Sequence, residues 1–128
     1  MDLKDKNLVQ GIDTVIIRVS DLEQSMAWYK DRLGFTTIWN DEHMKLVVLD
    51  TRGAVSITLW ETDHKIDCHK DAASFPIFKT TDVNSLYEYM KDHGVVVEPI
   101  IRDEYVAYFV FYDPDGNMLE ACQTLVKG

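Results

Sequence analysis

An internal repeat is the feature that most constrains this chain. A β-branched segment is followed by an aspartate suited to cap a helix, then apolar residues at helical spacing, then a glycine suited to end that helix. This order occurs twice, with the pairs Asp21 and Gly34 and then Asp82 and Gly94, separated by 13 and 12 residues. Because the same helix-start and helix-end residues recur at nearly the same separation, the sequence predicts two copies of one supersecondary unit.

The segments around these helices complete the unit. Apolar and β-branched runs predict strands at residues 13–20, 35–39, 45–50 and 54–60, and again at 74–80, 95–101, 106–113 and 117–123. Expected helices cover 22–33 and 83–93, and matching turns join the last two strands of each unit, at Asp50 to Gly53 and Asp113 to Gly116. The prediction is an α+β fold of two tandem β-α-β-β-β modules. We place a tail at 1–10, module one at 11–62, a polar linker at 63–74, module two at 75–123 and a second tail at 124–128.

Composition narrows the possible partners. The formal net charge of −9 argues against nucleic acid, whose phosphates require clustered lysine and arginine. The apolar runs are too short to cross a membrane, which needs about 20 residues. Two cysteines are too few for a disulfide framework, and the first ten residues have no apolar signal region, so we expect a cytoplasmic protein.

Two stretches of sequence resemble a known family. The segments "VIIRVSDLEQSMAWYKDRLGF" at 15–35 and "FYDPDGNMLEACQ" at 111–123 are similar to the vicinal oxygen chelate superfamily, which includes glyoxalases, bleomycin-resistance proteins and extradiol dioxygenases. The resemblance covers about residues 11–123. It implies that the strands of both modules form a curved mixed sheet around a cavity, with the helices outside, and that the protein is a homodimer.

The resemblance also implies four positions that bind a divalent metal in the metal-dependent members. They fall on Thr14, Thr58, Phe75 and Glu120, with Ile57 replacing Thr58 if the register shifts by one. Only Glu120 has a side chain typical of a metal ligand, and one carboxylate cannot hold a divalent ion against water. We therefore predict no metal and no other cofactor, and leave open a metal with ligands drawn from elsewhere.

The loop "HKIDCHK" is the other metal candidate. His64, Asp67, Cys68 and His69 have suitable donor atoms, but their spacing fits no established zinc motif, so we interpret the loop as solvated surface. His93 precedes Gly94, where a side chain can cover the end of the second helix. His43 lies in a polar turn and offers no partner in the sequence.

Strand alternation predicts which side chains line a cavity. The expected ligand-binding residues that share one face of the strands are Thr14, Ile16, Arg18, Ser56, Thr58, Trp60, Phe75, Ile77, Lys79, Tyr108, Val110, Met118 and Glu120. Trp39 is a further expected ligand-binding residue. Cys122 and Tyr112 belong to the same face. Glu120 is the candidate general acid or base, and Arg18 and Lys79 are candidates to pair with it. Trp28 and Tyr29 are expected to pack between the first helix and a sheet.

Three functions remain open at this stage. The first is a metal-independent protein, similar to the bleomycin-resistance branch, that sequesters a cationic or aromatic small molecule in an acidic, aromatic-lined cavity. The second is a glyoxalase-like lyase or dioxygenase that uses a divalent metal with non-standard ligands, or Glu120 as general base. The third is a structural or interaction protein whose pocket is filled by its own side chains.

Overall fold

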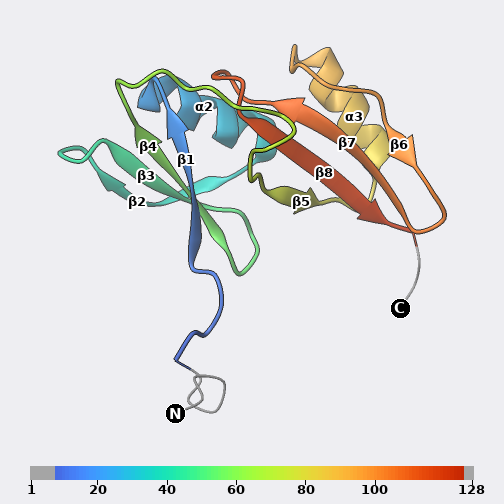
Figure 1. The fold of residues 1–128 in the computed structure, drawn as a ribbon, viewed down its shortest axis with the longest axis horizontal. Coiled ribbons are helices and arrows are strands. Elements are labelled where there is room, and N and C mark those ends of the chain that lie inside the picture. The colour runs from blue at the N-terminus through green and yellow to red at the C-terminus, as the bar shows by residue number, and fades with distance from the viewer. Residues whose placement is uncertain (1–7, 126–128) are drawn as a thin grey trace.

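Two modules of the same plan lie side by side in the computed structural model, which describes residues 8–125 (Figure 1). Module one consists of β1 (Thr14–Val19), α2 (Leu22–Leu33), β2 (Thr36–Asp41), β3 (Leu46–Asp50) and β4 (Ser56–Glu61). Module two consists of β5 (Ile77–Lys79), α3 (Val83–Asp92), β6 (Ile101–Arg102), β7 (Val106–Tyr112) and β8 (Met118–Thr124). The predicted α+β fold of tandem β-α-β-β-β units is confirmed.

The strands form two four-stranded sheets, ordered β1-β4-β3-β2 and β5-β8-β7-β6. In each sheet the first strand pairs in parallel with the last strand of its module, and the other pairs are antiparallel. The two sheets are not joined by backbone hydrogen bonds into one closed surface among the described residues. Each module therefore keeps its own sheet.

Both helices begin where the sequence predicts, α2 also ends there, and α3 ends one residue earlier, at Asp92. The Asp21 carboxylate accepts a hydrogen bond from the Gln24 N–H at 3.1 Å, and the Asp82 carboxylate accepts one from the Ser85 N–H at 3.0 Å. Gly34 ends α2 in the left-handed conformation at φ 72°. His93 covers the end of α3, with its Nδ1 2.8 Å from the Tyr89 carbonyl oxygen, which confirms its predicted position.

Two predicted strands of module two are shorter than expected. The segment 95–101 contributes an isolated bridge between Val97 and Phe111 and then the two-residue β6. Pro99 interrupts it, because proline has no N–H to donate to a neighbouring strand. The segment 74–80 is reduced to β5, which leaves Phe75 in the preceding loop.

The two matching turns differ in backbone conformation. In the β7–β8 turn the positive φ falls on Gly116, at 81°, as the sequence predicts for a glycine in this place. In the β3–β4 turn it falls on Arg52, at 69°, and not on Gly53. The two turns therefore match in sequence but not in backbone conformation, and Arg52 is held by hydrogen bonds at both its backbone and its side chain.

The core lies on the helix side of both sheets and continues from one module to the other. Alternate residues of β7 are fully buried, among them Phe109 and Phe111. Trp28 of α2 stacks on Phe111 with ring centroids 6.4 Å apart, and Tyr29 is completely buried. The predicted packing role of Trp28 and Tyr29 is confirmed, and α2 packs against strands of both modules (Figure 1).

Tyr89 lies at the surface of α3, where it contacts the other helix. It is 37% exposed, and its hydroxyl donates to the Asp31 carbonyl oxygen at 3.0 Å. Val83, at the start of the helix, is fully buried. Tyr89 thus joins α3 to the end of α2.

None of the described helices has the length and apolar character needed to span a membrane.

Candidate functional site

Except for Phe75, which lies in the loop before β5, the predicted lining residues lie on the faces of the two sheets that point away from the helices. We call these the open faces. Cross-strand pairing confirms that they share these faces, because Thr58 pairs with Ile16 and Val48, and Glu120 pairs with Ile77 and Val110. The open face of module one carries Thr14, Ile16, Arg18, Trp39, Val48, Ser56, Thr58 and Trp60, and that of module two carries Ile77, Lys79, Tyr108, Val110, Tyr112, Met118, Glu120 and Cys122.

Glu120 is the most unusual residue of these faces. It lies at the middle of a row of three strands, between Ile77 and Val110, and burial raises its pKa above the ordinary value of 4.5. No hydrogen bond or ion pair to its carboxylate is found among residues 8–125, although Arg18 and Lys79 were candidates to pair with it. A carboxylate among apolar neighbours without a partner is a group that a ligand could satisfy.

Thr58 occupies the same place in module one and is satisfied within the chain. Its hydroxyl lies 2.8 Å from the Thr14 hydroxyl, which also donates to the Ser56 carbonyl oxygen at 3.1 Å. Only 6% of Thr58 is exposed. This part of the open face therefore holds two hydroxyl groups that are hydrogen-bonded to each other.

The four positions that the resemblance assigns to metal ligands do not fit a divalent ion. Thr14 and Thr58 bind each other, Phe75 has no donor atom, and Glu120 supplies a single carboxylate. In the part of the chain that the structure describes, no three histidine, cysteine, aspartate or glutamate side chains come together as a metal site. Of the candidate metal ligands in the 63–74 linker, His69 and Asp67 form an ion-pair contact, with 3.7 Å between the imidazole Nε2 and a carboxylate oxygen. That the protein works without a metal stays a prediction.

Tryptophan and arginine form the aromatic part of the open face of module one. The Arg18 guanidinium lies 4.8 Å from the centre of the Trp60 ring and donates to the Trp60 and Glu61 carbonyl oxygens. The Trp60 indole in turn donates to the Met44 carbonyl oxygen at 3.0 Å. Trp39 is 55% exposed and is free to contact a ligand.

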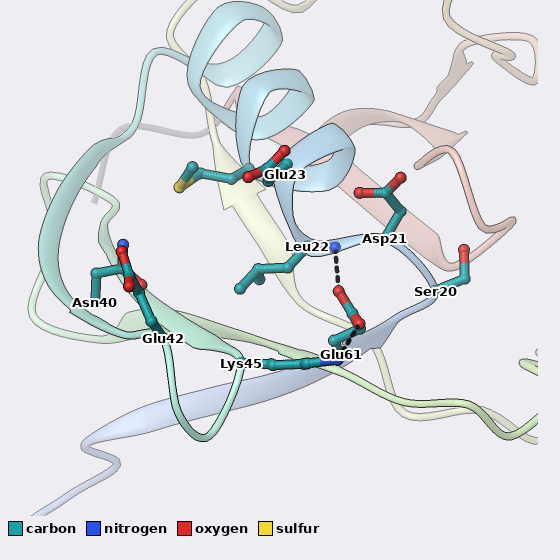
Figure 2. A pocket seen from close by; sticks show the side chains of 9 residues that line it. Ser20, Asp21, Leu22, Glu23, Asn40, Glu42, Lys45 and Glu61 are labelled. Atoms are coloured by element: carbon teal, nitrogen blue, oxygen red, sulfur yellow. Dashed lines mark hydrogen bonds and ion pairs between the residues drawn. The ribbon is translucent and has the colours of Figure 1, made fainter.

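Two cavities are found among residues 8–125, and neither brings most of these residues together. The acidic cavity, of about 630 Å³, lies at the beginning of α2 and is lined by Ser20, Asp21, Leu22, Glu23, Met26, Asn40, Glu42, Lys45 and Glu61. Figure 2 shows the two contacts of the Glu61 carboxylate. It accepts a hydrogen bond from the Leu22 N–H at 3.0 Å, and it lies 3.5 Å from the Lys45 ammonium nitrogen. Four carboxylates but no aromatic ring line this cavity, so the acidic and aromatic parts of the predicted site are in different places.

A second cavity, which we call the inter-module cavity, measures about 760 Å³. It is lined by Val15, Arg32, Leu33, Phe35, Thr51, Arg52, Gly53, Ala54, Val55, Ile57, Pro76, Ile77, Phe78, Lys79, Thr80 and Leu86. Of the predicted site residues only Ile77 and Lys79 belong to it. Sequence reasoning missed Arg32 because a basic residue in the last turn of a helix is ordinarily explained by the helix dipole. It missed Arg52 because that residue lies in a turn between two strands, far from α2 in the sequence.

Comparison with known protein sequences gives a family model and a curated relative. The sequence model described as Glyoxalase/Bleomycin resistance protein/Dioxygenase superfamily matches residues 11–121. Uncharacterized protein YraH of Bacillus subtilis is 27% identical over 119 residues, which cover 84% of this chain and 93% of YraH.

Solved structures of similar fold include two whose names refer to antibiotics. TnmS3 from Streptomyces, described as an antibiotic binding protein, matches with a TM-score of 0.73 and 21% identity over 91% of this chain and 98% of its own. The fosfomycin resistance protein FosX from Listeria monocytogenes matches with a TM-score of 0.77 and 18% identity over 91% of this chain and 94% of its own. At these identities the structural likeness shows the shared fold alone.

Proposed function

This chain belongs to the glyoxalase/bleomycin resistance protein/dioxygenase superfamily, and from that premise we propose that it binds a small cationic or aromatic molecule without a metal. The observation that carries the proposal is Glu120, a carboxylate without a partner among the described residues, in an apolar row of the open face. A cation placed there would lower the pKa of Glu120 and remove the cost of its burial. The antibiotic-binding role in the name of TnmS3 supports this direction.

The proposal includes a second copy of the chain. Large apolar side chains of the open faces are exposed in the single chain, with Ile16 at 51%, Trp39 at 55% and Ile77 at 55%. Exposed apolar groups that share a face are typical of an interaction surface. Pairing of two copies would cover them and turn the two open faces into walls of one cavity, with Glu120 inside.

The direct test uses naphthalen-2-ylmethylammonium, a planar aromatic cation, titrated while tryptophan fluorescence is recorded. We expect saturable quenching that Glu120→Gln weakens about tenfold or more, because a hydrogen bond to a charged group contributes about 1.5–3 kcal/mol. Glu104→Gln, which changes an exposed carboxylate outside the open faces, is the matched control. Equal binding by the Glu120 variant, or no saturable binding, would refute the proposal. Light scattering during size-exclusion chromatography measures whether two copies associate.

One observation favours an enzyme as the second candidate. Burial raises the pKa of Glu120, which brings a carboxylate closer to the range of a general base at neutral pH. An isomerase or lyase activity that rises with ionisation of one carboxyl group, and that disappears in Glu120→Gln without loss of folding, would support this candidate. Elemental analysis of untagged protein, with thermal-shift titration of nickel, zinc, manganese and iron(II), tests whether a metal takes part.

A further inference from the structure

The inter-module cavity has the opposite charge to the rest of the protein. Three cationic side chains line it, from Arg32, Arg52 and Lys79, and its lining includes no aspartate or glutamate. The chain as a whole carries 22 acidic and 13 basic residues. A cavity that gathers cations in an acidic protein provides a local attraction for anions.

Arg32 is the least satisfied of these cations. The residue lies in the last turn of α2 and is half-buried, and its Nε atom is buried without a hydrogen-bond partner in residues 8–125. None of the ion pairs among the described residues includes Arg32, Arg52 or Lys79. Because a buried donor without an acceptor destabilises a protein, an oxygen atom from a ligand would find Arg32 ready to donate.

Arg52 is held in place beside it. One of its terminal nitrogens donates to the Leu33 carbonyl oxygen at 3.1 Å, and its backbone N–H donates to the Asp50 carboxylate at 2.7 Å. The side chain packs on Gly34, where an added Cβ would lie 3.2 Å from the guanidinium. A guanidinium fixed in this way loses little conformational freedom when an anion binds.

The walls of the cavity indicate what else the ligand carries. Phe35, Phe78, Ile57 and Leu86 are among the apolar side chains that line it, and its volume lies within the range of about 300–1,000 Å³ typical of small-molecule sites. The carbonyl end of α2 also faces this region through Leu33, and that end of a helix disfavours a ligand with several negative charges. A single anionic group on an apolar body fits better than a polyphosphate.

We infer that the inter-module cavity, which shares only Ile77 and Lys79 with the open faces, is a second binding site for an organic carboxylate with an apolar or aromatic body. The carboxylate binds Arg32 and Lys79, with Arg52 close by, and the apolar body packs against Phe35 and Phe78. The site depends on contacts between the two modules, so its occupation stabilises their mutual arrangement.

Isothermal titration calorimetry with naphthalene-2-carboxylate tests this inference. We expect millimolar or tighter binding that Arg32→Gln weakens about 10- to 100-fold, because a hydrogen bond to a charged group contributes about 1.5–3 kcal/mol. Arg102→Gln is the control, since it removes the same charge from the exposed strand β6, outside the cavity. The binding should weaken as salt increases.

Two further arms separate this site from the open faces. Naphthalene-2-carboxylate should bind Glu120→Gln as well as it binds the unchanged protein, whereas the ammonium analogue should not depend on Arg32. Amide chemical shifts of Phe78 and Leu86 should move on titration of the unchanged protein, which reports the location even if a variant folds poorly. No binding at millimolar concentration, equal binding by Arg32→Gln, or loss of binding in Glu120→Gln alone would each overturn the inference.

Discussion

The two modules have the same backbone plan but use equivalent positions differently. The register of β4 with β1 and β3 repeats in β8 with β5 and β7, so Thr58 and Glu120 occupy the same place in their sheets. In module one that place holds a hydroxyl bound to Thr14, and in module two it holds a carboxylate that no described residue binds. A repeat therefore shows where function is to be sought, namely where one copy satisfies a polar group internally and the other does not.

The two equivalent turns also differ, in the module to which each is hydrogen-bonded. The β7–β8 turn is tied to module one: the buried Asp113 accepts a hydrogen bond from the Tyr29 hydroxyl at 2.8 Å, and Asp115 accepts bonds from the backbone and side chain of Ser20. Asn117 also donates to the Arg18 carbonyl oxygen at 3.0 Å. The β3–β4 turn, by contrast, bonds to residues of its own module. The modules are thus joined through one turn, not through both.

Substitutions in the cores of the two modules should give the largest loss of stability. The pair Phe109 and Ala121 occupies the place that Val47 and Leu59 occupy in module one. Phe109→Ala should lower the free energy of unfolding by about 3–5 kcal/mol, and Val47→Ala by about 2 kcal/mol, because the larger ring leaves a larger cavity. Urea unfolding followed by circular dichroism measures both. A Val47 variant as destabilised as the Phe109 variant would show that both cores tolerate loss of volume alike.

The next largest effect should come from Asp113. Its carboxylate also accepts the N–H groups of Asp115 and Asn117, each at 2.9 Å, so Asp113→Ala leaves several donors without an acceptor. We expect a loss of about 2–4 kcal/mol in the free energy of unfolding, against about 0.5–1.5 kcal/mol for Asp50→Ala in the equivalent turn. Tyr29→Phe, which removes the cross-module bond alone, should fall between them. Equal losses for Asp113→Ala and Asp50→Ala in urea would contradict the idea that one turn joins the modules.

The glycines of the two turns give a smaller contrast. Gly116 has φ at 81° and no atom near the site of an added Cβ, so Gly116→Ala should cost about 1–2 kcal/mol through backbone strain alone. Gly53 does not need a left-handed conformation, and its added Cβ would meet Thr51 at an ordinary 3.7 Å. Gly53→Ala should therefore be neutral or slightly stabilising. Thermal melting of the two variants compares them, and a destabilised Gly53 variant would contradict this view of the turn.

The smallest change in stability should come from Glu120, and at pH 7 its substitution should stabilise the protein instead of destabilising it. Because burial raises the pKa of Glu120 in the folded protein, the folded state binds more protons than the unfolded state in the pH range between the two pKa values. The stability that this group contributes is therefore lost as pH rises through the folded pKa. Glu120→Gln should therefore raise the melting temperature at pH 7 and change it little at pH 4. Thr58→Val at the equivalent position should lower it at both pH values, since it leaves the Thr14 hydroxyl without its partner. A pH-independent effect of Glu120→Gln would contradict the assignment.

The sequence predicted what depends on local chemistry. Both N-caps, the end of α2 and the face on which Glu120 lies follow from short-range patterns, and the structure confirms them. Pro99 explains why one strand was predicted too long, although its effect was visible in the sequence. The predicted ligand-binding roles themselves are not tested by the fold.

The inter-module contacts could not be predicted in the same way. Arg32, Phe35 and Phe78 meet in one cavity because α2 packs against both modules, and no periodicity in the sequence encodes that packing. The buried pair of Tyr29 and Asp113 is separated by 84 residues. The sequence around each residue shows only an aromatic on a helix and an acid in a turn. Which acid lies near which aromatic depends on how the two modules dock.

That separation also bears on how the chain acquires its fold. During synthesis, module one emerges first, yet the hydroxyl of its buried Tyr29 has no acceptor until Asp113 has been made. The first helix therefore cannot complete its packing until Asp113, 84 residues after Tyr29, has been made, and contacts of such long sequence separation slow folding. A ribosome pausing before that turn would hold an incomplete first module in which Trp28 lacks its contact with Phe111, and such uncovered apolar surface favours aggregation.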